Sequence, residues 1–218
     1  MARFLLIIGM DRTRFFNLST SPATSGSGEL RTEIVRKAIH FLIALSPSMA
    51  SINRPLTVLF LMVGTLGYTL MEYLRLSGVN VPVISSLTGM ASRSRDIGHF
   101  VMGPVTLGMG ALLALLLYPS YAAAIAIYAL AFGDGFASLV GKFFGKWRPA
   151  FLFGKSVEGS FACFTAVFVS AYAVSGNLRI AVVAALSATI VEAMPINDYD
   201  NMAIPVTVGL FVQLAALW

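Results

Sequence analysis

The sequence predicts an all-α polytopic membrane protein of about seven transmembrane helices. Hydrophobic residues make up 57% of the 218 residues and charged residues only 11%, and the mean hydropathy is +0.82. Both values lie far from the average of soluble proteins, since so little charge cannot cover a water-soluble fold. Apolar runs near the roughly 20 residues that a bilayer requires follow one another along the chain. These two observations define the fold class.

Residues 1–28 are predicted to form an N-terminal interfacial segment and a flexible linker. The opening MARFLLIIGMDR has an apolar stretch too brief for a signal peptide, and STSPATSGSG is rich in Ser, Thr, Gly and Pro. Residues 29–218 are predicted to form the transmembrane catalytic domain. The one cysteine, Cys163, lies in an apolar run and is expected to pack as a small apolar residue.

Seven apolar runs follow the linker. Tight turns are expected at Arg54-Pro55, Tyr118-Pro119-Ser120 and Ser175-Gly176-Asn177, and longer connections at Gly78–Arg95 and Gly145–Lys155. The predicted helices are Ile34–Ile52, Leu56–Leu76, Ile97–Tyr118, Tyr121–Phe143, Val157–Ser175, Leu178–Met194 and Met202–Trp218.

The basic residues define an orientation. If the helices alternate, 13 of the 15 Lys and Arg fall on the side of the N-terminus, and only Arg54 and Arg179 on the other. The positive-inside rule makes the first side cytoplasmic and places the C-terminus outside. These bases flank apolar segments and form no solvated basic domain, which argues against nucleic acid as a partner. All ten acids fall on the same side, although acids contribute little to topology.

Polar residues share one face of the first predicted helix. Glu33, Arg36, Lys37 and His40 are spaced three, four and seven apart, so they lie together near the cytoplasmic end and could hold phosphate. The alternative is a plain Lys/Arg anchor with a satisfied histidine.

Small residues recur every fourth position around an acid in the fourth run. Gly133, Ala137, Gly141 and Gly145 would allow a neighbouring helix to approach closely. Packing does not account for Asp134, because an ionised carboxylate at helix-centre depth costs about 2.5–3.5 kcal/mol. Asp134 is therefore expected to bind a metal or substrate, with a structural hydrogen bond as the alternative.

The connection after this run is basic and glycine-containing. It carries Lys142, Lys146 and Arg148, and then GKSVEGS, which opens the fifth helix. A helix N-terminus offers free N–H groups and a favourable dipole, so phosphate is the expected ligand. A P-loop is excluded, because Pro149 stands where its first glycine is required and no strand precedes it.

Carboxylates gather at the same predicted membrane face. Asp134, Glu158, Glu192, Asp198 and Asp200 come from three helices and have the hard oxygen atoms that suit magnesium with a nucleotide. Each acid alone could instead cap a helix or pair with Lys or Arg.

The segments EIVRKAIHF, FGDGFASLVGKFFGK, GKSVEGS, VEAMP and DNMAIP, in this order, resemble the CTP-dependent lipid kinases. That group includes dolichol kinase, phytol kinase and fungal-type diacylglycerol kinase. The likeness covers about Glu29 to Trp218, and Arg95-Asp96-Ile-Gly98 also looks like a segment of the family. It implies transfer of the γ-phosphate of CTP to the hydroxyl of a lipid alcohol at the cytoplasmic face, with CDP as the other product.

The resemblance implies roles for individual residues. Asp134, Glu192 and Lys155 are the expected catalytic residues, with Asp134 preferred over Glu192 as the base. A divalent cation, Mg²⁺ first and Ca²⁺ second, is expected at Asp134, Glu158, Glu192 and Asp200. The expected nucleotide-binding residues are Arg36, Lys37, His40, Gly135, Gly141, Lys142, Lys146, Gly154, Lys155, Ser156, Gly159 and Asn201.

Two other functions are open at this point. Phosphatidate cytidylyltransferases share the Gly-Asp helix and the Gly-Lys, Glu-Gly segment, but their C-terminal signature is missing here. A small ion-coupled transporter or scaffold would need polar access from both faces, and the outer half of the predicted bundle offers almost none. The expected partners are CTP, the bilayer and a lipid alcohol, either a prenol or diacylglycerol. The sequence also leaves open whether the protein forms a homodimer.

Overall fold

The structure is a computed structural model that describes residues 26–82 and 98–217, and every regular element in these ranges is helical. The predicted linker lies outside the described residues except for Gly26–Gly28, which begin the first helix, and Arg95-Asp96 lies outside them as well. The longer helices are α1 (Gly26–Leu42), α2 (Ser46–Leu76), α4 (Gly103–Leu117), α5 (Ser120–Tyr128), α6 (Gly135–Phe143), α7 (Val157–Ser175), α8 (Leu178–Ala193) and α9 (Asp200–Ala215).

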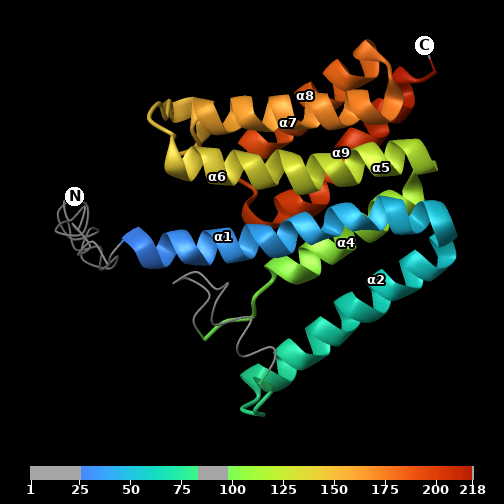
Figure 1. Cartoon of the computed structure of the whole chain (residues 1–218). Coiled ribbons are helices and arrows are strands. Elements are labelled where there is room, and N and C mark those ends of the chain that lie inside the picture. Colours follow the sequence, from blue (N-terminus) through green and yellow to red (C-terminus); the bar gives the residue numbers. More distant parts are fainter. Residues whose placement is uncertain (1–25, 83–97, 218) are drawn as a thin grey trace, which may run out of the picture.

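The first two predicted helices form a hairpin whose two arms diverge. The 3₁₀ turn η2 (Ile43–Leu45) joins α1 to α2, and α2 turns back at Asn53, whose φ of −152° and ψ of 95° are not helical. The Asn53 side chain accepts a hydrogen bond from Leu56 N–H at 3.0 Å, so it caps the turns that follow. The predicted break at Arg54-Pro55 is therefore confirmed, and the returning half of α2 diverges from α1 (Figure 1).

One long continuous helix contains Asp134, the predicted catalytic acid. α5, the π-helical segment η4 (Ala129–Asp134) and α6 run without interruption through the predicted range Tyr121–Phe143. A π segment has one residue more per turn than an α-helix and often marks a functional site. Asp134 is its last residue, so the widened turn sets the direction of this side chain.

The remaining helices pack around this long helix through small side chains. α6 packs on α7, α7 on α8, and α8 on α9, and the core they share contains Ala129, Cys163 and Ala184. A Cβ on Gly133 would lie 2.7 Å from Val167, and one on Gly159 would lie 2.8 Å from the Ala137 carbonyl oxygen. The small-residue pattern thus brings α6 and α7 together as predicted.

The end of the bundle away from the predicted polar face carries a separate cation. Arg54 donates to the carbonyl oxygen of Tyr118 at 2.6 Å and also to that of Leu115. These carbonyls end α4, where the helix dipole favours a positive charge. Arg54 is therefore occupied at a helix C-terminus.

Three described stretches are long and apolar enough to cross a membrane by length and composition: Thr32–Leu76, Ser120–Phe143 and Val157–Ser175. The first has 45 residues, about twice what one crossing needs, and Asn53 divides it. α4 and α9 are shorter apolar helices.

A close approach between α4 and α9 gives a testable prediction. Pro205 lacks the N–H that would bond the Asn201 carbonyl, and Gly110 of α4 lies against that carbonyl. A Cβ at position 110 would lie 2.0 Å from the Asn201 oxygen, so Gly110→Ala must push the helices apart. We expect a loss of about 1–3 kcal/mol of stability, measured by thermal unfolding in detergent.

Gly103→Ala is the matched control, because a Cβ at this position of α4 meets nothing within 4 Å. It should change stability by less than about 0.5 kcal/mol. Equal stability of the two variants would contradict the close packing of α4 and α9.

Candidate active site

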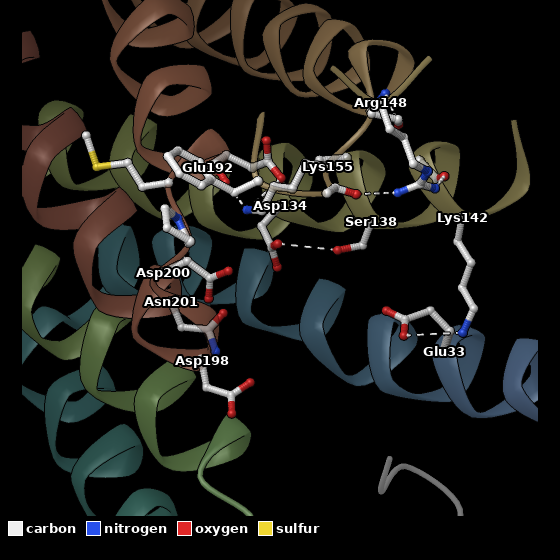
Figure 2. A pocket seen from close by; sticks show the side chains of 18 of the residues that line it. Glu33, Asp134, Ser138, Lys142, Arg148, Lys155, Glu192, Asp198, Asp200 and Asn201 are labelled. Atoms are coloured by element: carbon white, nitrogen blue, oxygen red, sulfur yellow. Dashed lines mark hydrogen bonds and ion pairs between the residues drawn. The ribbon is translucent and has the colours of Figure 1, made fainter. Parts of the chain in front are cut away.

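A polar cavity of about 400 Å³ lies at one end of the bundle, between α1, α6, the start of α7 and the connection from α8 to α9 (Figure 2). Cationic and acidic side chains mix in its wall. The residues that line it are Glu33, Arg36, Asp134, Ala137, Ser138, Gly141, Lys142, Arg148, Phe153, Gly154, Lys155, Ser156, Gly159, Glu192, Met194, Pro195, Asp198, Asp200 and Asn201.

Asp134 lines the cavity and is held by side chains of α1. Its Oδ2 accepts a hydrogen bond from Lys37 Nζ and lies 3.3 Å from His40 Nε2. Ser138, one turn later, donates to Oδ1 at 3.4 Å. His40 Nε2 also lies 2.9 Å from the Leu130 carbonyl oxygen, so Lys37 and His40 fasten α1 to the π segment behind the cavity.

Lys155 and Glu192 form the second pair. Lys155 Nζ lies 3.0 Å from Glu192 Oε1 and also donates to the Glu192 carbonyl oxygen. Glu192 is only 5% exposed, and its Oε2 is buried with no hydrogen-bond partner among the described residues. A buried carboxylate oxygen without a donor is costly, so this atom is suited to accept a proton or bind a cation.

Ionic side chains on α1 and α6 flank another part of the cavity. Arg36 Nη2 lies 2.5 Å from Glu33 Oε1, and Lys142 Nζ lies 4.0 Å from Glu33 Oε2 (Figure 2). Arg36 and Lys142 therefore lie beside the same carboxylate at this wall of the cavity, where both could also contact an anionic ligand.

The connection from α8 to α9 contributes two further acids to the cavity wall. Asp198 lies in the 3₁₀ turn η6 (Asn197–Tyr199), and Asp200 begins α9 (Figure 2). The buried Asn201 side chain donates to Thr106 Oγ1 at 3.0 Å, so α4 fixes the start of α9. Both acids are held by this contact at the same edge of the cavity.

The connection from α6 to α7 is fixed by its own hydrogen bonds. Arg148 donates to the carbonyl oxygens of Gly141 at 2.7 Å and Gly154 at 2.6 Å. The α7 N–H groups of Val157 and Gly159 are already bonded, to the Trp147 carbonyl and to the Ser156 hydroxyl. Some of the backbone N–H groups expected to bind an anion here are therefore already bonded within the protein. The dipole of α7 and the Lys155 side chain can still attract an anion.

The structure brings most of the predicted site residues together, but not all of them. Lys37, His40 and Gly135 lie behind the cavity wall, and Gly135 packs against Phe41. Lys146 is exposed away from it. Glu158 accepts hydrogen bonds from the backbone N–H groups of Lys146 and Trp147. These contacts occupy Glu158 outside the cavity.

Two lining residues, Ser138 and Phe153, were not predicted from the sequence, whereas Glu33 and Arg148 were named there only as members of a polar helix face and of a basic connection. Ser138 follows Asp134 by four residues, so helical spacing could have indicated it. Phe153 carries no comparable spacing signal.

The predicted four-carboxylate metal site does not form as one cluster. Among the described residues, no three His, Cys, Asp or Glu side chains are placed to hold a metal ion by themselves. A magnesium ion bound with a nucleotide needs only one or two carboxylates plus phosphate and water oxygens. Glu192 and Asp200 fit that smaller requirement, because Oε2 of Glu192 lacks a partner and Asp200 lines the same cavity.

No family model and no solved structure matches the chain. A protein named "Probable phytol kinase, chloroplastic" from Triticum aestivum is 34% identical over 98 residues, which are 38% of this chain and 33% of that protein. "Probable phytol kinase 1, chloroplastic" from Oryza sativa subsp. japonica is 26% identical over 155 residues, 63% of this chain and 49% of that protein. The chain thus spans about a third to a half of the length of these relatives. Over these segments it is similar to proteins named as phytol kinases.

Proposed function

We propose that this protein is a membrane-embedded kinase that transfers the γ-phosphate of CTP to the hydroxyl of a lipid alcohol. The observation that carries the proposal is a cavity of mixed charge, built among apolar helices, in a chain similar to proteins named probable phytol kinases. A phytol-type isoprenoid alcohol is the first expected acceptor. CTP as the donor follows from the family resemblance of the sequence motifs.

The cavity supplies the charges that phosphoryl transfer needs. Arg36, Lys142 and Lys155 would neutralise the triphosphate. Asp200, together with phosphate and water oxygens, would hold a divalent cation, Mg²⁺ first. Such an ion would supply positive charge to stabilise the charge that develops on the transferred phosphoryl group.

The proton of the acceptor hydroxyl needs a base. The lipid oxygen attacks the γ-phosphorus, the bond to the β–γ bridging oxygen breaks, and CDP leaves. Asp134 accepts a hydrogen bond from Lys37, whereas Glu192 Oε2 has no partner in the part of the chain that the structure describes. We therefore assign the proton to Glu192 in place of Asp134, and assign to Asp134 the placement of α1 against the cavity.

The proposal includes a membrane arrangement. The described helices alternate in direction (Figure 1), and the cavity gathers Glu33 and Arg36 of α1, the ends of α6 and α8, and the starts of α7 and α9. We propose seven crossings, with the N-terminus and this cavity on the cytoplasmic side, because most Lys and Arg belong to that end.

The direct test uses purified full-length protein in lipid nanodiscs with γ-labelled CTP and Mg²⁺. Phytol, a polyprenol and diacylglycerol are offered separately. We expect label in the phosphorylated alcohol, strongest with phytol, and CDP in equal amount. Release of labelled pyrophosphate when phosphatidate is supplied would support a cytidylyltransferase instead. Label in no lipid and no CDP formation would overturn the kinase proposal.

A further inference from the structure

Phe153 is the one aromatic side chain among the described residues that line the cavity. Its side chain is largely open to solvent, with 66% of the residue exposed. Its backbone has a φ of 50°, in the left-handed region. A large residue without glycine's freedom is rarely found there and costs about 1–3 kcal/mol relative to ordinary conformations.

Hydrogen bonds on both sides hold Phe153 in this conformation. Phe153 N–H donates to the Ala150 carbonyl at 3.2 Å, and Lys155 N–H donates to the Leu152 carbonyl at 2.9 Å. Arg148 binds the next carbonyl, that of Gly154, and ties it to α6 through the Gly141 carbonyl. The ring is thus presented at the cavity by a turn that is already organised.

The position of the ring relative to the charges suggests its ligand. Phe153 lies two residues before Lys155, which pairs with Glu192 inside the cavity. Within the proposed function, Lys155 contacts phosphate, so the remainder of a nucleotide extends from there toward the rim. A nucleobase is planar and needs an apolar or aromatic face.

We propose that Phe153 is the stacking platform for the nucleobase of the bound nucleotide, an inference that rests on the proposed function. Stacking accepts any base, because every base has a π face. Phe153 therefore contributes affinity and position, and does not select CTP over ATP. The strained turn is explained as pre-organisation of this platform.

Phe151 provides a matched control in the same connection. It is 71% exposed, close to the value for Phe153, but it does not line the cavity. Exposed aromatic residues also anchor proteins at the membrane interface. If both phenylalanines served only as anchors, their replacement would have equal effects.

The test measures binding of CTP and of inorganic tripolyphosphate to the full-length protein and to Phe153→Ala, Phe153→Tyr and Phe151→Ala. We expect Phe153→Ala to weaken CTP binding by about 10- to 100-fold and leave tripolyphosphate binding unchanged. Phe153→Tyr should restore CTP binding, and Phe151→Ala should match the unmodified protein. Circular dichroism checks that each variant is folded.

The proposal is wrong if Phe153→Ala binds CTP normally, or if it loses CTP and tripolyphosphate to the same extent. Equal losses in Phe151→Ala and Phe153→Ala would indicate a membrane anchor instead. Absence of CTP binding by the unmodified protein would overturn the proposed function and this inference together. A failure of this inference alone is different, because the unmodified protein then still binds CTP.

Discussion

Replacing Lys37 by Met is expected to destabilise the protein by about 3–5 kcal/mol. Lys37 is 1% exposed and Asp134 is 5% exposed, and the two side chains are paired. Removing one partner of a buried pair leaves an uncompensated charge away from water. Denaturation in detergent, followed by circular dichroism, measures the loss.

A double variant separates stability from catalysis. Lys37→Met combined with Asp134→Asn removes both charges, so it should recover most of the lost stability. Arg179→Met is the control, because the Arg179 side chain is exposed and replacing such a residue usually changes stability by less than about 0.5 kcal/mol. If Lys37→Met and Arg179→Met were equally stable, the buried pair would not hold α1 in place.

The helices could be predicted from the sequence because apolar runs and turn residues act locally. Asn53 and Pro55 end one apolar run. Gly176, with a φ of 62°, ends the run that forms α7. The glycine pattern around Gly141 also predicted a close helix contact, since a residue without a side chain at every fourth position leaves one open face.

Partners of the charged residues could not be predicted in the same way. Lys37 was expected to contact phosphate, but it lies 97 positions from Asp134 in the sequence and pairs with it in the fold. Glu158 was expected to bind the metal ion as the acid of the GKSVEGS segment, yet it accepts hydrogen bonds from the backbone N–H groups of Lys146 and Trp147. The π segment that directs Asp134 has no sequence signal that distinguishes it from an α-helix.

The acids of the predicted metal site therefore differ in whether the protein already supplies a partner for them. Asp134 and Glu158 already have partners within the protein, whereas Glu192 has a buried oxygen, Oε2, without a partner in residues 26–82 and 98–217. A buried carboxylate oxygen without a protein donor is destabilising. Ligand binding would relieve that cost, which is why we assign the reactive position to Glu192.

Replacing Glu192 by Gln is therefore expected to lower kcat/KM for the lipid kinase reaction by about 100- to 1,000-fold, the range seen when one group that stabilises the transition state is removed. Gln keeps the shape of Glu and can still meet Lys155, but it can neither accept a proton nor bind a divalent cation strongly. The measurement is the labelled CTP assay at saturating lipid alcohol, with folding checked by thermal unfolding.

Glu158→Gln is the comparison that makes this result informative, because the sequence motif assigns both acids to the same metal site. An amide oxygen at position 158 can still accept the N–H groups of Lys146 and Trp147, so this variant should lose less than about tenfold, or 1.4 kcal/mol. A large loss at Glu158 with little loss at Glu192 would reverse the assignment: the catalytic carboxylate would then belong to the connection before α7, and the cavity would have to rearrange when the nucleotide binds.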